Sequence, residues 1–130
     1  MKQTIYRTIF WIGYVTVLTA SFITLKNDLH KVTFDVISFQ FHLDQVLHAV
    51  VYFLICMYFL AGKHFGLTLF RDNSVKWFLL VVLFLATFTE VVQLFVPSRA
   101  FNVFDMLANV VGVGVGLGVM WLVGRVGSKK

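Results

Sequence analysis

The chain has 130 residues, of which 59% are hydrophobic and only 13% are charged. Soluble domains carry about 25% charged residues, so this composition excludes a soluble globular protein and favours a membrane protein. The net charge is +5, but the basic residues flank apolar segments, where they set orientation and contact lipid headgroups. We therefore expect no nucleic-acid partner. Because Cys56 is the single cysteine, an intrachain disulfide is excluded.

Four apolar segments are long enough to cross a bilayer, which takes about 20 residues of helix. They lie at about 8–25, 43–62, 75–96 and 104–123. Pro97 follows the third segment, where a helix should stop. The pattern predicts an all-α, polytopic membrane protein with one four-transmembrane-helix bundle, a single domain over residues 1–130.

The distribution of Lys and Arg predicts the orientation of this bundle. One side holds eight of them: Lys2, Arg7, Lys63, Arg71, Lys76, Arg125, Lys129 and Lys130. The other side holds Lys26, Lys31 and Arg99. Since the more basic flanks stay inside, both termini are expected in the cytoplasm. The outer loop 26–42 is apolar, and it either rests on the membrane interface or covers a site as a lid.

Polar side chains recur at helical spacing near the outer end of three predicted helices. Ionisable groups in lipid are costly and need a partner or a purpose. The stripes comprise Asp44, His48 and Tyr52; Glu90 and Gln93; and Asp105, Asn109, Gly112 and Gly116, with Arg99 in the turn before the last helix. Two interpretations stay open: a network that fastens the helices together, or an outward-facing polar pocket that binds a ligand. Neither a metal nor another cofactor is expected, because only one histidine belongs to the cluster.

The glycines of the fourth helix form two faces. Gly112 and Gly116 share the polar stripe, so we expect them to pack against other helices. Gly114 and Gly118 point the opposite way, and a homodimer through that face is the lesser alternative.

Three motifs give the chain a resemblance to a known family. They are D-x-x-x-H at Asp44 and His48, T-E-x-x-Q-x-x-x-P-x-R from Thr89 to Arg99, and D-x-x-x-N-x-x-G-x-x-x-G from Asp105 to Gly116. In order and spacing they resemble the VanZ-like family of bacterial membrane proteins. Gln45 stands where that family usually has Lys, and Ser98 where it has Gly. The resemblance covers the second to the fourth helix.

The resemblance implies a role in the cell envelope, in the bacterial cytoplasmic membrane, and an association with resistance to the glycopeptide teicoplanin. The expected ligand is an anionic membrane lipid, a lipid-linked cell-wall precursor or a lipoglycopeptide. A non-enzymatic binding protein is the leading hypothesis. The alternatives are an intramembrane enzyme, with the carboxylates and His48 as acid/base groups, and a membrane scaffold or assembly factor.

Overall fold

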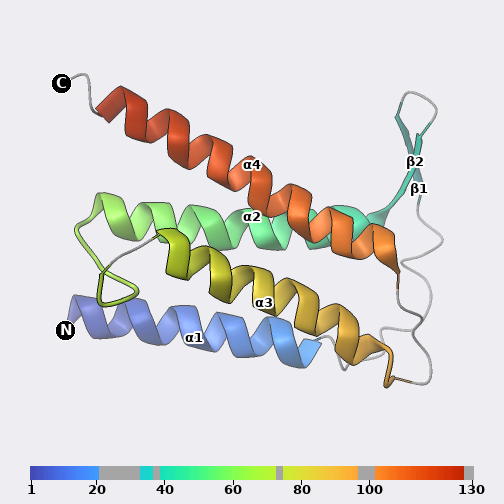
Figure 1. Cartoon of the computed structure of the whole chain (residues 1–130), viewed down its shortest axis with the longest axis horizontal. Helices are drawn as coiled ribbons and strands as arrows, with labels where there is room; N and C mark the ends of the chain where they lie inside the picture. Colours follow the sequence, from blue (N-terminus) through green and yellow to red (C-terminus); the bar gives the residue numbers. More distant parts are fainter. Residues whose placement is uncertain (21–32, 37–38, 73–74, 97–101, 128–130) are drawn as a thin grey trace. The chain divides into compact units, whose positions relative to one another are not determined.

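The computed structural model describes residues 1–20, 33–36, 39–72, 75–96 and 102–127 (Figure 1). The helices are α1 (Lys2–Ala20), α2 (Leu43–His64), α3 (Val75–Gln93) and α4 (Val103–Gly127). Within the described ranges, three of them are long and apolar enough to cross a membrane: Gln45–His64 in α2, α3 and α4. The predicted segment 8–25 coincides with α1 only as far as Ala20, since residues 21–25 lie outside the description.

The structure adds two short strands to the predicted all-α fold. Strands β1 (Thr33–Val36) and β2 (Phe39–His42) pair antiparallel, with Thr33 opposite His42. They lie in the segment that sequence analysis treated as an apolar loop. An alternation of apolar residues with a period of two is the sequence signal of a strand, and Phe34, Val36, Phe39 and Phe41 carry it.

Several predicted helix ends are corrected. Helix α3 ends at Gln93 rather than at 96, and Leu94, Phe95 and Val96 continue as tight turns with i→i−3 hydrogen bonds. The following residue in the sequence, Pro97, has no N–H and disfavours helical geometry in the residue before it, which explains the early end. Two helices are longer than their apolar segments: α1 starts at Lys2 and α4 ends at Gly127, so each includes residues of a polar flank.

Helix α2 ends two residues later than predicted, at a glycine-dependent cap. Gly66 has a φ of 69°. Its N–H donates to the Lys63 carbonyl at 3.2 Å, and the Leu67 N–H donates to the Gly62 carbonyl at 2.8 Å. This pair of bonds is the Schellman arrangement, in which a residue with positive φ satisfies the last carbonyls of a helix.

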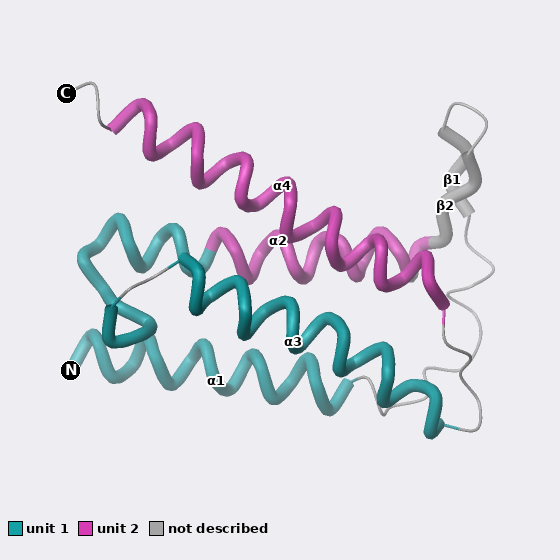
Figure 2. Tube along the Cα trace, viewed as in Figure 1, with its two compact units in different colours: residues 1–24, 58–101 teal, residues 25–57, 102–130 magenta. Residues whose placement is uncertain are grey.

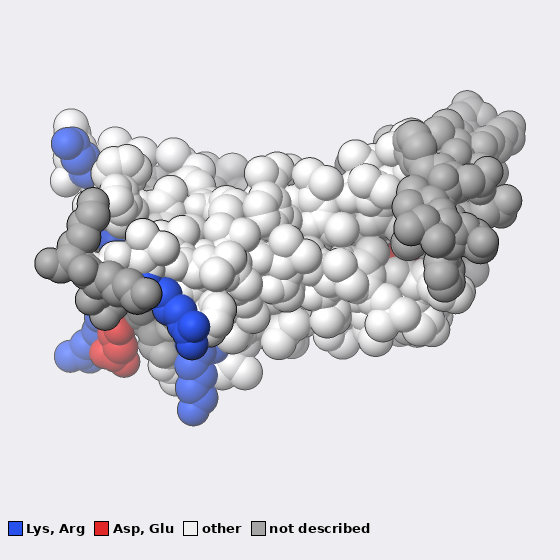
Figure 3. Space-filling view, turned by 90° about the horizontal axis from the view of Figure 1, so that it is seen from above, with Lys and Arg blue, Asp and Glu red and all other residues white. Residues whose placement is uncertain are grey.

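The chain divides into two compact units, which Figure 2 shows in teal and magenta. Unit 1 contains residues 1–24 and 58–101, and unit 2 contains residues 25–57 and 102–130. Helix α2 contributes to both. Most of the face in Figure 3 is white, formed by residues other than Lys, Arg, Asp and Glu. Large exposed apolar side chains on all four helices suit contact with lipid acyl chains.

Aromatic rings hold unit 1 together. Tyr6 of α1 stacks on Tyr58 of α2 with 4.9 Å between ring centroids. Phe59 stacks on Phe78 of α3 at 4.1 Å, and Phe10 lies 6.4 Å from Phe78. The Tyr58 hydroxyl also donates to the Tyr6 carbonyl at 3.0 Å. These contacts fix the first helix against the end of the second and the beginning of the third.

Close backbone approach holds unit 2 together. A Cβ atom added at Gly112 would collide with the Ala49 carbonyl oxygen and lie 2.9 Å from its carbonyl carbon. One added at Gly116 would collide with the Cys56 Cβ atom and lie 2.9 Å from its Sγ. Helices α2 and α4 therefore meet at a surface that only glycine permits, as in other small-residue helix contacts in membranes.

Substitution of these glycines should separate the two helices. We expect Gly112→Ala to lower the free energy of unfolding in detergent by about 1–3 kcal/mol, because the added methyl group meets backbone that cannot rotate away. Gly114→Ala is the matched control, since nothing lies within 4 Å of its added Cβ, and alanine favours helix by about 1 kcal/mol. Equal unfolding curves for the two variants would contradict the close approach.

Candidate functional site

The polar stripes predicted on α2 and α4 lie inside unit 2. Asn109 is 0% exposed and Tyr52 is 1% exposed, and Asp105 is also buried. His48 is half-buried. Polar atoms taken out of water are costly unless they are hydrogen-bonded, so each of these side chains needs a partner.

His48 and Asn109 are brought together by the helix contact. The Nδ1 atom of His48 lies 2.9 Å from the Oδ1 atom of Asn109. Because an amide oxygen can only accept, Nδ1 must carry the proton in this arrangement. Nε2 is then the nitrogen with the lone pair whenever the ring is neutral. The bond thus links α2 to α4 and favours the neutral tautomer of His48 that carries its proton on Nδ1.

The glycine contact explains why this bond can form. Asn109 precedes Gly112 by about one turn of α4, and His48 is adjacent to Ala49, the residue that Gly112 approaches. A short side chain such as Asn reaches a partner on the next helix only when the two backbones are close. The Cys56 thiol also lies 3.9 Å from the Val113 carbonyl, one turn further along the same contact.

Asp105 has a structural role that sequence analysis did not predict. Asn102 caps α4, with its Oδ1 accepting from the Phe104 N–H at 3.0 Å. Its Nδ2 donates to the Asp105 Oδ1 at 3.0 Å. Asn before the first helical residue is a favourable cap, and a carboxylate in the first turn suits the helix dipole. Asn directly before an apolar segment is the signal that could have identified this cap.

Glu90 and Gln93 lie on α3, which belongs to unit 1. Glu90 is 0% exposed, and Gln93 and Thr89 are also buried. The Thr89 hydroxyl donates to the Ala86 carbonyl at 3.1 Å. One face of α3 therefore buries three polar side chains near the end of the helix. That Glu90 meets His48 and Asp105 in a shared cluster stays a prediction.

Two of the predicted site residues fall outside the description. Asp44 lies in the first turn of α2, but its side chain is not among those described. Arg99 lies outside the described residues altogether. Within the described ranges, no three His, Cys, Asp or Glu side chains lie close enough together to hold a metal ion.

A second polar network, which the sequence does not predict, lies at the basic end of unit 1. Gln3 and Arg7 of α1 both bind Thr68, which lies in the connection between α2 and α3. The Thr68 N–H donates to the Gln3 Oε1 at 2.9 Å, and the Gln3 amide donates back to the Thr68 carbonyl. Gln and Thr at such positions carry no recognisable spacing, because their partner is more than sixty residues away in the sequence.

A double-mutant cycle measures the bond between His48 and Asn109. We expect His48→Leu and Asn109→Leu each to destabilise the protein, and the double variant to lose less than the sum of the two. The coupling should be about 0.6 kcal/mol, up to about 1.7 kcal/mol, as for hydrogen bonds between membrane helices. Unfolding in mixed detergent micelles gives the free energies of unfolding of the wild type and the three variants. Strictly additive losses would show that the two side chains do not interact.

Comparison with known proteins agrees with the motifs. No curated protein sequence and no solved structure matches the chain significantly. The family model described as VanZ/LLP1 matches residues 4–124, a range that includes nearly all of the four helices. Together with the apolar composition of the helices, the match identifies a multi-pass membrane protein. The chain belongs to the VanZ/LLP1 family.

Proposed function

We propose that this protein binds an anionic, lipid-linked molecule of the cell envelope through the polar side chains of α2 and α4. The candidate ligands are an anionic membrane lipid, a lipid-linked cell-wall precursor and a lipoglycopeptide. The observation that carries the proposal is the burial of three polar side chains in unit 2, together with half-buried His48 bonded to one of them, Asn109. The other two are Tyr52 and Asp105.

The number and kind of these groups favour binding over simple helix fastening. One hydrogen bond between two helices suffices to set their register, and the glycine contact sets their distance already. The buried group nevertheless also contains the Asp105 carboxylate, one turn before Asn109 in α4, and the Tyr52 phenol, one turn after His48 in α2. Ionisable groups at membrane depth mark binding or transport sites more often than purely structural ones.

The charge for an anionic ligand would come from Arg99. It precedes α4 by four residues in the sequence, and a guanidinium binds phosphate or carboxylate with two parallel hydrogen bonds. Glu90 and Gln93 on α3 complete the proposed site on the basis of their motif. We place the site near the outer face of the bacterial cytoplasmic membrane, with both termini in the cytoplasm.

The family supports an envelope role and, by resemblance, a part in resistance to teicoplanin. That antibiotic carries a lipid tail, and a lipid-linked cell-wall precursor is another candidate ligand. A protein that holds either molecule near the outer leaflet would change how much antibiotic reaches its target. Binding alone therefore accounts for a resistance phenotype, without a chemical step.

The orientation is tested by labelling single cysteines in intact cells. In a Cys56→Ser background, we expect Ser98→Cys to react with a membrane-impermeant maleimide and Ser128→Cys to react only after the cells are permeabilised. Ser98 adjoins Arg99 on the expected outer side, and Ser128 follows α4 on the basic side. The reverse pattern would place the proposed pocket in the cytoplasm and refute an outward-facing site.

Ligand binding is tested by native mass spectrometry of the purified protein in mild detergent, with undecaprenyl pyrophosphate as the probe. We expect Arg99→Ala and His48→Ala each to weaken binding about tenfold, because each removes a charged or polar contact to the headgroup. Arg71→Ala and His64→Ala are the matched controls, since both residues are exposed and lie outside the motifs. Teicoplanin susceptibility should follow the binding data.

Three outcomes would overturn the proposal. Unchanged binding and susceptibility in well-expressed Arg99→Ala and His48→Ala proteins would exclude the pocket. Complete loss of function in Glu90→Gln with binding retained would indicate the intramembrane enzyme instead. Loss in Gly114→Leu and Gly118→Leu alone would indicate a scaffold that holds a partner through the outer glycine face.

A further inference from the structure

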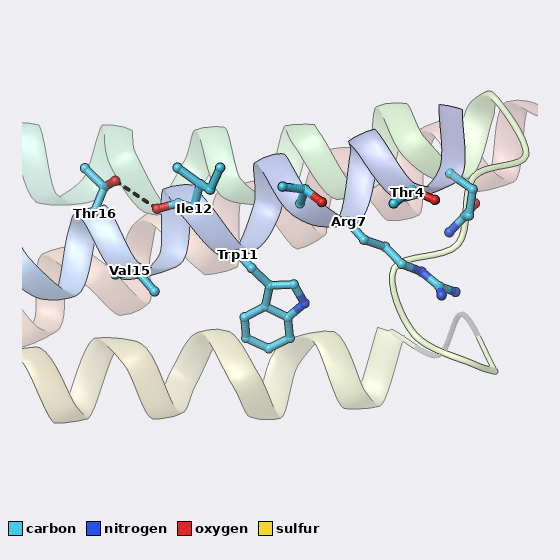
Figure 4. Close-up of a pocket in the computed structure, with 8 residues that line it drawn as sticks. Thr4, Arg7, Trp11, Ile12, Val15 and Thr16 are labelled. Carbon is cyan, nitrogen blue, oxygen red and sulfur yellow. Dashed lines mark hydrogen bonds between the residues drawn. The ribbon is translucent and has the colours of Figure 1, made fainter. Parts of the chain in front are cut away.

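A groove of about 610 Å³ runs along one face of α1 in unit 1 (Figure 4). Its polar end is formed by Gln3, Thr4, Arg7 and Thr8, and its apolar wall by Trp11, Ile12 and Val15. Thr16 lines the far end, where its hydroxyl donates to the Ile12 carbonyl. The groove thus changes from polar to apolar along the axis of a single helix. Neither the family motifs nor the proposed site includes any of these residues.

The Arg7 guanidinium is held in place from the side of the α2–α3 connection. Its Nε donates to the Thr68 carbonyl at 2.9 Å, and one terminal nitrogen donates to the Thr68 hydroxyl at 3.1 Å. Gln3 binds the same residue and supports this arrangement. A guanidinium has five N–H donors, so these two bonds leave donors for another molecule. Because its geometry is already fixed, Arg7 loses little conformational freedom when it binds an anion.

The charge of Arg7 is not neutralised by the protein where the structure describes it. Over the described residues, Arg7 makes no ion pair with a carboxylate; both acceptors of its bonds are uncharged groups of Thr68. Arg7 is also half-buried, which weakens the screening of its charge by water. A positive charge in this setting favours an anion beside it.

The hydroxyl groups next to Arg7 are available as donors. Thr16 and Thr19, further along α1, donate to the carbonyls of Ile12 and Val15 at 2.8 and 2.9 Å. Among the described residues, Thr4 and Thr8 make no such bond and lie exposed. Since they are four residues apart, they lie on the same face of the helix.

The apolar wall lies on a helix that packs beside a candidate membrane span. Helix α1 packs beside α3, a candidate span, through Phe10 and Phe78, and the Tyr14 hydroxyl reaches the Val81 carbonyl at 3.5 Å. On the face of α1 that carries the groove, the Ile12 side chain is 61% exposed and the Val15 side chain is 53% exposed. Trp11 contacts Phe10 and Tyr14 with 5.4 Å between ring centroids in both pairs, so its ring has a defined position along the groove.

We infer that this groove binds one anionic glycerophospholipid. The phosphate oxygens accept hydrogen bonds from the Arg7 guanidinium and from the Thr4 and Thr8 hydroxyls. An acyl chain lies along Trp11, Ile12 and Val15. The occupant is a lipid because the groove opens on the exposed face of a helix that packs beside a candidate membrane span. It is anionic because Arg7, which forms no ion pair with a carboxylate of the described residues, lies at the polar end.

Native mass spectrometry of the full chain, with added phosphatidylglycerol or phosphatidylcholine, tests this inference. We expect the wild-type protein to bind one phosphatidylglycerol molecule more tightly than phosphatidylcholine. Arg7→Gln should weaken that binding about tenfold. Ile12→Trp should weaken it to a similar degree by filling the groove, while the bonds between Arg7 and Thr68 stay intact.

Two controls match these variants. Lys63→Gln removes the same charge from an exposed position of unit 1 that does not line the groove. Ile9→Trp adds the same ring to a different groove beside α1, one that Ile9 lines together with Tyr58 and Phe65. Both controls should stay within about twofold of wild type, well short of the tenfold loss. All measurements are repeated with His48→Ala present, so that lipid at the proposed α2–α4 site is not counted.

The inference is wrong if Arg7→Gln and Lys63→Gln weaken binding equally, because the lipid would then respond only to diffuse charge. It is also wrong if Ile12→Trp binds phosphatidylglycerol as well as Ile9→Trp does, or if wild type binds the two lipids equally. Should Arg7→Gln fail to fold, the comparison of Ile12→Trp with Ile9→Trp decides the question alone. Loss of undecaprenyl pyrophosphate binding with this lipid retained would contradict the proposed function only.

Discussion

The approach of two helix backbones at Gly112 and Gly116 is the constraint on which unit 2 depends. No larger residue fits against Ala49 and Cys56, so the separation of α2 and α4 is fixed by the absence of side chains. That separation brings the short amide of Asn109 within 2.9 Å of His48. The polar residues and the packing glycines of α4 lie on the same stripe of the helix. The close approach at the glycines allows the Asn109 side chain to reach His48.

Unit 1 is assembled on a different principle. Large rings fill its interior, with Tyr6 on Tyr58 and Phe59 on Phe78, and the Gln3 and Arg7 side chains bind Thr68 at its basic end. At Gly62 an added Cβ atom would meet the Tyr6 ring, so the tyrosine packs directly against the backbone of α2. The exposed face of α1 carries the groove of unit 1, whereas the polar and glycine stripe of α4 packs against α2.

Hydropathy predicted α2, α3 and α4 as spans because the cost of placing polar backbone and side chains in lipid dominates every other term. The described part of the first predicted span, in α1, is not among the candidate spans. The starts of α2 and α3 agree with the prediction to the residue. The ends were less predictable, since they depend on local hydrogen bonds: the Gly66 cap, the turns before Pro97 and the Asn102 cap. The strand pair is not predicted by hydropathy, because apolar content does not distinguish a strand from a helix and only the period of two does.

The same reasoning found His48 and Asn109 but not Arg7. A polar residue inside an apolar helix stands out in the sequence, and helical spacing shows which neighbours share its stripe. A basic residue at a helix end is expected in any membrane protein, so the sequence predicts for Arg7 only a role in orientation. What distinguishes Arg7 is its partner. Thr68 accepts hydrogen bonds from two guanidinium nitrogens but carries no charge that would neutralise the arginine. A positive charge that is fixed and not neutralised can do more than orient a helix, and only the tertiary contact reveals it.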